Sequence, residues 1–374
     1  MRILFACGGS AGHINPALAV AGLLKKEHKN TQIRFVGNPN KMESRLVPNA
    51  GYDFSPLLVE GFQRSFTPEN IKRNFHALSC LLRCTQEVRR ILAEFKPDIV
   101  VGTGGYVSGP VLREAAKQGI PTLTHESNAL PGMTTKLLAK TARRVLLAVE
   151  KTKEYLPKSC DCVVTGNPVR AELFSVSRPA ARKKLDISDE HICVLSLGGS
   201  HGAARVNQAV AGVISHFYAE NRLHHIHATG RYGIDAFPDM LRNKGIEPDS
   251  ARLDIREYID NMADCLAAAD LVICRAGAIT IAELQAVGRA SVLIPSPNVA
   301  ENHQYPNAMV LQNHNAAVVI EEKDLSEEML GEVVRALLAD PQELENMGKN
   351  AAAMAVPDAA ARICSEIFGV LGKS

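Results

Sequence analysis

A strand, a glycine-rich turn and a helix follow one another near the start of the chain and again just past its middle. The turns read G-G-S-A-G-H at residues 8–13 and G-G-S-H-G-A at residues 198–203, each directly after a short apolar run. Glycine lets the backbone approach a bound group closely and adopt positive φ angles, and the free N–H groups of the following helix attract anions. The repeat therefore predicts two similar α/β halves, each opening with a loop suited to a phosphate group.

Short apolar runs alternate with amphipathic stretches in both halves, which is typical of a parallel sheet covered by helices. The chain has 374 residues, too many for one hydrophobic core, so we expect two Rossmann-like domains facing across a cleft. The first would comprise residues 1–165 and a C-terminal helix at about 355–374, and the second residues 166–354. Strands are expected at residues 3–6, 32–36, 54–58, 98–101, 122–125, 145–148, 162–164, 192–197, 225–229, 251–254, 271–274, 291–294 and 317–320. Functional residues should lie in the loops after the carboxyl ends of these strands.

Charge and cysteine usage exclude several classes of protein. The net charge of +2 gives no general attraction for nucleic acid, so we expect no nucleic-acid partner. The nine cysteines form no C-x-x-C pair and no metal-ligand array, and most fall in apolar runs, which indicates reduced, buried thiols in a cytoplasmic protein. The chain opens with a strand rather than a signal peptide, and no stretch approaches the ~18–20 apolar residues of a membrane span.

Several nucleotide and metal motifs are absent from the sequence. There is no G-x-x-x-x-G-K-[ST], and no acidic residue follows Gly12 at the ~20-residue distance of a dinucleotide fingerprint, which argues against a P-loop hydrolase and against NAD. No D-x-D occurs, so we expect neither a metal on a diphosphate nor any other cofactor. G-x-S-x-G, the setting of a hydrolase nucleophile, occurs at residues 8–12 and 198–202, but two copies in matching halves fit a repeated binding loop better.

Other polar loops follow predicted strands, and each has a structural alternative. G-T-G-G-Y-V-S-G-P at residues 102–110 is a second glycine-rich turn of the first half, and H-E-S-N at residues 125–128 could be functional or could cap a helix. In C-R-A-G-A-I-T-I-A-E at residues 274–283, Glu283 is placed to accept two hydrogen bonds from a ribose diol, but Thr280 and Glu283 could instead form a capping box. The amides of Q-Y-P-N-A at residues 304–308 suit the hydroxyls of a sugar.

With these motifs together, the chain resembles the MurG family, the undecaprenyldiphospho-muramoylpentapeptide β-N-acetylglucosaminyltransferases of glycosyltransferase type B fold. The matching segments are residues 8–13, 102–110, 125–128, 166–170 (G-N-P-V-R), 198–203, 274–283 and 304–308. The resemblance implies an inverting, metal-independent transfer of N-acetylglucosamine from UDP-N-acetylglucosamine to the 4-hydroxyl of the muramoyl sugar of lipid I. The product would be lipid II, a precursor of the peptidoglycan cell wall.

The resemblance also implies roles for individual residues. In the second half, Ser200 would hold the diphosphate, Ile259 would present its backbone to the uracil, and Gln304 would contact the sugar. Glu283 would bind the ribose, and Arg170 would lie near the diphosphate. The remaining donor-binding residues would be Ala278, Ile279, Thr280, Ile281 and Ala282 in the second half, and Ser10, Ala11, Gly12 and Asn128 in the first. The loops for the acceptor or its diphosphate would contain Gly104, Gly105, Tyr106 and Ser108.

The reaction needs a base, because the attacking hydroxyl must lose its proton. His13 is the first candidate, since a neutral imidazole is a fair base at cytoplasmic pH. Glu126 is the second candidate, and it could instead orient the acceptor. The sequence departs from the common family pattern at Ala11, Ser127 and His303, where Gly, Gln and Gln are usual, so contacts to the sugar would be shared differently.

A lipid-linked acceptor implies contact with a membrane. Basic and apolar side chains alternate in one segment, which favours docking on an anionic membrane surface over a core-facing helix. The residues are Phe62, Arg64, Phe66, Ile71, Lys72, Arg73, Phe75, Leu78 and Leu82. We therefore expect a peripheral protein on the cytoplasmic face of the cell membrane, with cell-wall assembly proteins as candidate partners. The alternatives are a transferase acting on a diacylglycerol-type lipid, a nucleotide-sugar 2-epimerase and a non-catalytic UDP-sugar binding module.

Overall fold

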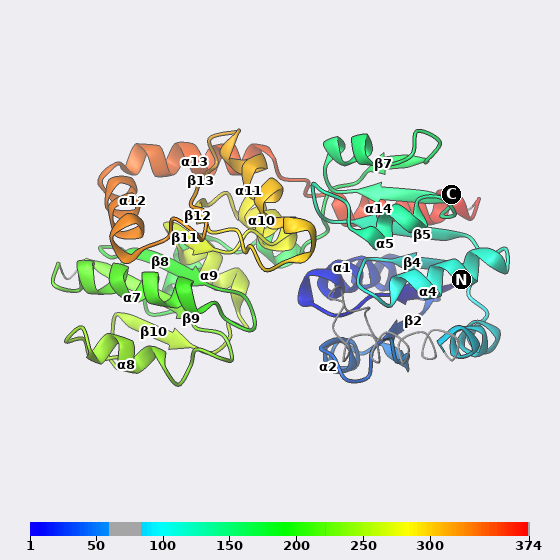
Figure 1. Ribbon diagram of the computed structural model, residues 1–374, viewed down its shortest axis with the longest axis horizontal. Coiled ribbons are helices and arrows are strands. Elements are labelled where there is room, and N and C mark those ends of the chain that lie inside the picture. The colour runs from blue at the N-terminus through cyan, green and yellow to red at the C-terminus, as the bar shows by residue number, and fades with distance from the viewer. Residues whose placement is uncertain (60–83, 221, 373–374) are drawn as a thin grey trace, which may run out of the picture. The chain divides into compact units, whose positions relative to one another are not determined.

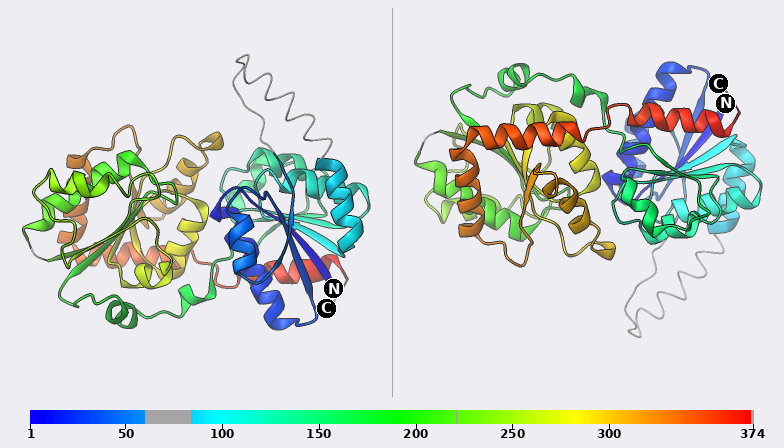
Figure 2. Two further views of the ribbon diagram at one scale, coloured as in Figure 1. Left: turned by 90° about the horizontal axis from the view of Figure 1, so that it is seen from below. Right: turned by 90° about the horizontal axis from the view of Figure 1, so that it is seen from above.

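The computed structural model describes residues 1–59, 84–220 and 222–372, which form two compact units. The first unit comprises Met1–Arg170 with Val356–Ser374, and the second comprises Ala171–Ala355. The chain thus passes between the units at Arg170 and at Val356, where the sequence suggested 165 and about 355. Each unit is a parallel sheet with helices on both faces, as expected for a Rossmann-like domain (Figure 1, Figure 2).

The sheet of the first unit has seven parallel strands in the order β3-β2-β1-β4-β5-β6-β7. Its strands are β1 (Arg2–Ala6), β2 (Gln32–Gly37), β3 (Asp53–Pro56), β4 (Ile99–Gly102), β5 (Thr122–Glu126), β6 (Arg144–Leu147) and β7 (Cys162–Val164). Its helices are α1 (Ala11–Glu27), α2 (Glu43–Asn49), α4 (Ser108–Lys117), α5 (Met133–Leu138), η1 (Glu150–Tyr155) and α14 (Ala359–Val370). Residues 84–95 are also helical.

Alternation along β1 shows how the sequence builds two hydrophobic layers from one strand. Ile3 and Phe5 join the cluster beneath α1, whereas Leu4 and Ala6 join the cluster on the opposite face of the sheet. Residues of α14, among them Ile363, belong to the same cluster as Ile3 and Phe5. The last helix of the chain therefore completes the core of the first unit, beside α1 (Figure 2).

The sheet of the second unit has six parallel strands in the order β10-β9-β8-β11-β12-β13. Its strands are β8 (Ile192–Leu197), β9 (Leu223–Ala228), β10 (Leu253–Arg256), β11 (Leu271–Cys274), β12 (Ala290–Leu293) and β13 (Ala317–Val319). Its helices are η2 (Ala171–Phe174), α6 (Arg178–Lys184), α7 (Ala204–Tyr218), α8 (Phe237–Arg242), α9 (Met262–Ala268), α10 (Ala278–Val287), η3 (Ala300–Asn302), α11 (Gln304–Gln312), α12 (Glu327–Ala339) and α13 (Pro341–Ala353).

Each sheet has one point at which the winding of the strands reverses. In the first sheet this point lies between β1 and β4, and in the second it lies between β8 and β11. Ligands of open parallel sheets bind outside the carboxyl ends of the strands at such a point. The two G-G-S loops leave β1 and β8, so both lie at the reversal point of their own sheet (Figure 1).

The first helix, α1, begins at Ala11 after an extended N-cap at Ser10 (φ −151°, ψ 157°). Pro16 lies inside the helix, where its fixed φ is compatible and only one N–H group is lost. As a result, His13 lies in the first helical turn rather than in the loop before it.

Candidate functional site

His13 is held by the carbonyl of the glycine loop that precedes it. Its Nδ1 lies 3.1 Å from the Gly8 carbonyl oxygen and 3.3 Å from Ser10 Oγ. A carbonyl oxygen can only accept a hydrogen bond, so Nδ1–H donates to Gly8, and in the neutral ring Nε2 is the basic nitrogen. The backbone of His13 is held as well, because Thr103 Oγ1 donates to its carbonyl oxygen over 2.6 Å. This is the tautomer that a general base requires.

Gly104 and Gly105 are required both by their backbone angles and by the space around them. Their φ angles are +106° and +83°. A Cβ atom at Gly104 would lie 2.5 Å from His13 Cδ2, and one at Gly105 would lie 2.2 Å from the Gly8 carbonyl oxygen. The loop after β4 therefore packs directly on the loop after β1, and the His13 ring lies against it.

Glu43 positions the first glycine loop, and no sequence pattern indicates this role. Its side chain is fully buried at the start of α2. Oε2 accepts from the Gly9 N–H over 3.1 Å, and Oε1 accepts from the Asn38 N–H over 2.9 Å. A Cβ atom at Gly8 would lie 2.2 Å from Oε1, which explains a glycine there. Burial, reinforced by the Glu43 charge, raises the pKa of the neighbouring Cys7 thiol, so Cys7 stays neutral.

Ser10, Ala11 and Gly12 form the N-cap and first turn of α1, where the first N–H groups have no acceptor within the helix. Ser10 is exposed, and Ala11 and Gly12 are partly exposed. Their backbone can therefore donate to an anionic or hydroxyl group that enters this edge of the sheet.

Ser108, predicted to lie in a loop for the acceptor or its diphosphate, has a structural role within that loop. It is fully buried, and its Oγ lies 2.7 Å from the Ala6 carbonyl oxygen and 2.8 Å from that of Gly104. The hydroxyl also accepts from the Gly104 N–H over 3.2 Å. Ser108 therefore ties the end of β1 to the glycine turn and has no surface for a substrate. Tyr106, by contrast, is 66% exposed and remains available for one.

Glu126 is engaged by four hydrogen-bond donors of its own loop. Oε1 accepts from the N–H and Nδ2 of Asn128 over 3.0 and 2.9 Å. Oε2 accepts from the Gly132 N–H over 3.0 Å and from Thr135 Oγ1 over 2.6 Å. The carboxylate is buried, so these bonds favour a positioning role over that of a base. Because Nδ2 of Asn128 points to Glu126, the amide of this half-exposed residue is held in one orientation.

The first residue of the H-E-S-N motif lies within β5 and belongs to the core. His125 is 1% exposed, and its Nε2 lies 2.9 Å from the Gly166 carbonyl oxygen. Burial lowers the pKa of His125, so the ring is neutral and donates this bond. It links β5 to the segment that leaves the first unit.

In the second unit, the G-G-S-H-G-A loop turns through two glycines with positive φ, +92° at Gly199 and +82° at Gly202. The Gly202 N–H donates to the Gly199 carbonyl oxygen over 2.9 Å, which closes the turn. A Cβ atom at Gly202 would lie 2.2 Å from the Thr229 carbonyl oxygen, so this loop packs on the loop after β9. Ser200 lies between the two glycines and is partly exposed, as a diphosphate ligand would need to be.

The segment from Ala278 to Glu283 is the first part of α10, and its N-cap is Gly277. Thr280 therefore lies in the first helical turn and Glu283 in the second, so the capping box weighed against a ribose contact does not form. Glu283 is 9% exposed. Burial and, second, the Glu283 charge raise the pKa of the Cys274 thiol to about 12, which indicates a carboxylate close to the end of β11. The other predicted positions, Ile279, Ile281 and Ala282, lie along the same helix.

The other predicted donor residues lie in neighbouring loops at this edge. Gln304 begins α11, and its Oε1 accepts from the Ser296 N–H over 2.9 Å, so the Nε2 amide protons are directed away from this bond and can donate to a ligand. Ile259 is 2% exposed in the loop between β10 and α9, where its backbone rather than its side chain can bind. Asn307, the second amide of the Q-Y-P-N-A motif, is buried, and its Nδ2 donates to the Ala276 carbonyl oxygen over 3.4 Å. Arg170 is half-buried and is the last residue of Met1–Arg170, the first of the two segments that form the first unit.

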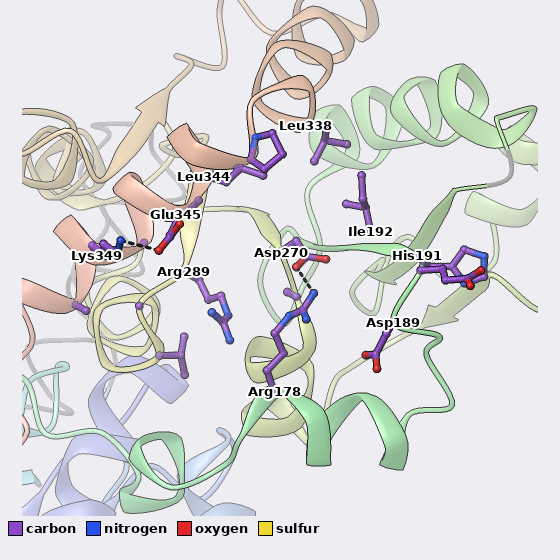
Figure 3. Close-up of a pocket in the computed structure, with 18 residues that line it drawn as sticks. Arg178, Asp189, His191, Ile192, Asp270, Arg289, Leu338, Leu344, Glu345 and Lys349 are labelled. Carbon is purple, nitrogen blue, oxygen red and sulfur yellow. Dashed lines mark hydrogen bonds and ion pairs between the residues drawn. The ribbon is translucent and has the colours of Figure 1, made fainter.

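A cavity of about 540 Å³ lies at the opposite edge of the second sheet, where the strands begin (Figure 3). Its charged groups serve the fold. Asp270 accepts from Arg178 Nη2 over 2.5 Å and from the Cys193 N–H over 2.8 Å. Arg289 donates to the carbonyl oxygens of Leu266 and Ala267 and so caps the C-terminus of α9. This cavity is therefore separate from the loops described above.

Among residues 1–59, 84–220 and 222–372, no group of three or more His, Cys, Asp or Glu side chains could hold a metal ion. Eight cysteines in these ranges have free thiols, six of them buried. No helix in the same part of the chain is long and apolar enough to cross a bilayer. The predicted membrane-docking residues 62–82 lie outside the described residues.

The fold and these loops define the class of protein. Two doubly wound parallel sheets, each with a glycine loop at its reversal point, are the architecture of type B glycosyltransferases. Residues 3–147 match the glycosyltransferase family 28 N-terminal domain, and residues 192–363 match the family 28 C-terminal domain. The chain therefore belongs to glycosyltransferase family 28.

The full length of the chain is similar to individual transferases. It is 42% identical to the UDP-N-acetylglucosamine–N-acetylmuramyl-(pentapeptide) pyrophosphoryl-undecaprenol N-acetylglucosamine transferase of Acetivibrio thermocellus, over 99% of this chain and 98% of the relative. It is 40% identical to the transferase of the same name from Clostridioides difficile, over 99% and 89% of the two chains. The crystal structure of Acinetobacter baumannii MurG matches with a TM-score of 0.75 and 29% identity, over 98% and 99% of the chains.

Proposed function

We propose that this protein transfers N-acetylglucosamine from UDP-N-acetylglucosamine to the 4-hydroxyl of the muramoyl sugar of lipid I, forming lipid II. The observation that carries the proposal is the hydrogen bond from His13 Nδ1 to the Gly8 carbonyl, which makes Nε2 the basic nitrogen of a neutral ring next to a glycine loop at the reversal point of the first sheet. The names of its full-length relatives support the identity of both substrates.

The second unit would bind the donor. The loop around Ser200 and the N-terminus of α7 offer N–H groups to the diphosphate, and Glu283 on α10 offers a carboxylate to the ribose. The backbone of Ile259 would meet the uracil, and the amide of Gln304 would meet the sugar. Arg170 would add a positive charge near the diphosphate.

The first unit would receive the acceptor and supply the base. Nε2 of His13 takes the proton of the muramoyl 4-hydroxyl while its oxygen forms a bond to C1 of N-acetylglucosamine. The bond from C1 to the β-phosphate oxygen breaks, and UDP leaves with the electron pair and its negative charge. Attack opposite to the leaving group inverts the α-linked donor to a β-linked product. The helix N-termini after the glycine loops stabilise the departing charge, so no metal is needed.

The acceptor is linked to a lipid, so the protein would work as a peripheral protein on the cytoplasmic face of the cell membrane. The basic and apolar side chains of residues 62–82 support docking on anionic lipid. Proteins of cell-wall assembly are proposed as partners.

The experiment that tests this function uses the purified protein, labelled UDP-N-acetylglucosamine and three conditions. With a lipid I analogue we expect a labelled disaccharide-lipid and one UDP for each product molecule. With a diacylglycerol acceptor, or with no acceptor, we expect no glycolipid and no 2-epimerised sugar. Transfer only to diacylglycerol, or epimerisation without transfer, would refute the proposal and select one of the alternatives.

A further inference from the structure

The loop after β9 is held tightly on the G-G-S-H-G-A loop of the second unit. The Arg231 N–H donates to the Ser200 carbonyl oxygen over 3.3 Å, and the Tyr232 N–H donates to the His201 carbonyl oxygen over 3.2 Å. A Cβ atom at Gly230 would lie 2.0 Å from the backbone nitrogen of Gly202, so the two backbones touch. The two loops are therefore held together at the carboxyl edge of the sheet.

The loop after β9 is also fixed from behind. Asn207 Nδ2 on α7 donates to the Thr229 carbonyl oxygen over 2.9 Å, and the Gly230 N–H donates to the Glu257 carbonyl oxygen over 3.1 Å. The rings of His201 and Tyr232 stack with centroids 6.0 Å apart and 27° between their planes. A group on this loop is thus preorganised, and binding costs little reorganisation.

Arg231 is the cationic residue whose backbone this arrangement holds against Ser200. Its side chain is exposed, whereas the other arginines near these loops are engaged elsewhere. Arg205 Nη2 donates to the Leu325 carbonyl oxygen, Arg256 pairs with Asp254, and Arg275 pairs with Glu322. Among the described residues, no ion pair involves Arg231. An exposed guanidinium on a rigid backbone, next to a glycine loop suited to phosphate, has the geometry of an anion ligand.

We propose that Arg231 binds the β-phosphate of the uridine diphosphate and stabilises that group as it leaves. The inference rests on the proposed function, because it assumes a UDP-sugar at the Ser200 loop. It adds a cationic ligand from within the second unit itself. The guanidinium keeps its charge throughout the reaction, so its contribution grows as negative charge develops on the departing UDP.

The test dissects the nucleotide and needs no acceptor. Dissociation constants of UDP, UMP and uridine are measured by isothermal titration calorimetry for the full chain and for Arg231→Gln. We expect the variant to bind UDP about 10- to 100-fold more weakly, the loss of one charge-assisted hydrogen bond, while UMP and uridine change by less than about threefold. Arg231→Lys should recover part of the loss, because it restores the charge without the fork of donors.

The matched control is Arg242→Gln, which removes an exposed arginine on α8 of the same unit, paired there with Asp239. It should bind all three ligands as the unchanged protein does. Two results would overturn the inference: Arg231→Gln that binds UDP normally, or equal losses for UDP, UMP and uridine, which would indicate a structural role. Failure of the unchanged protein to bind UDP would overturn the proposed function as well, so the two failures are distinguishable.

Discussion

At the scale of single residues, His13 is the proposed general base. We predict that His13→Ala lowers kcat by about 10²–10⁴, because the acceptor hydroxyl loses its base. The dissociation constant of UDP-N-acetylglucosamine should stay nearly unchanged, since the donor residues other than the first-turn backbone lie elsewhere. Steady-state kinetics and calorimetry measure the two quantities on one preparation. Equal losses of turnover and donor binding would remove His13 as the base.

Gly104 tests whether the orientation of His13 matters. Gly104→Ala places a Cβ atom 2.5 Å from the His13 ring at a φ of +106°, so we predict a fall in kcat of about 10- to 100-fold. Gly119→Ala is the matched control, because Gly119 also has a positive φ (+75°) but open space around it. The control should lose about 1 kcal/mol of stability and keep its turnover. A normal kcat in Gly104→Ala would show that the ring needs no such packing.

Substitution of Glu126 distinguishes a positioning role of this residue from a catalytic one. Both Glu126 oxygens accept hydrogen bonds from N–H or O–H donors. In Glu126→Gln one oxygen becomes an NH₂ group, which cannot accept and would face these donors. We therefore predict a loss of about 1–3 kcal/mol in the free energy of unfolding. Turnover should fall far less than in His13→Ala, with a higher KM for the donor as Asn128 loses its partner. Unchanged stability with the full loss of turnover would make Glu126 the base instead. Thermal unfolding and steady-state kinetics give both readouts.

At the scale of elements, β9 carries a pH dependence that is unrelated to catalysis. Ser196 Oγ lies 2.7 Å from both His225 Nε2 and His227 Nδ1 in the core of the second sheet. Burial lowers the pKa of His227 to about 3, and burial with the neighbouring His227 and His224 lowers the pKa of His225 well below its usual value. Both rings are therefore neutral in the folded chain.

The unfolded chain binds protons at these histidines below its ordinary pKa of about 6.5, while the folded chain does not. Stability is therefore full above pH 6.5 and falls as the pH drops toward 3, by about 1.4 kcal/mol per pH unit for each buried histidine. Denaturant unfolding at pH 7 and pH 5 should show this fall, and histidine NMR resonances of β9 should stay neutral at pH 5. Rings that titrate near pH 6.5 in the folded state would contradict the prediction.

The elements also show what a sequence can and cannot predict. The strand–glycine–helix repeat predicted both parallel sheets and the edge at which their loops gather, because that information is local. The capping box at Thr280 could not be excluded locally, since it depends on α10 beginning at Ala278. The role of Glu43 could not be predicted for a different reason. Its hydrogen-bond partners Gly9 and Asn38 come close to it only when β1, β2 and α2 pack together. The structural role of Ser108 likewise depends on a hydrogen bond to the carbonyl oxygen of Ala6, 102 positions earlier in the chain.

At the scale of the whole molecule, the chain forms two units of the same architecture. In the proposed reaction, the first unit would supply the base and the second would supply the ligands for the nucleotide. The return of α14 to the first unit means that the chain passes twice between them. Removing residues 356–374 would expose the hydrophobic cluster that contains Ile3 and Phe5. We therefore expect this truncation to destabilise the first unit.

The configuration of the product, formed without metal, tests whether the transfer is inverting and metal-independent. The measurement is the anomeric coupling constant, by NMR, of the disaccharide formed from UDP-N-acetylglucosamine and a lipid I analogue in excess EDTA. We predict a β-linked disaccharide at an undiminished rate, because N–H groups and arginines would stabilise the leaving diphosphate in the proposed mechanism. An α-linked product, or transfer that stops until a divalent metal is restored, would contradict it.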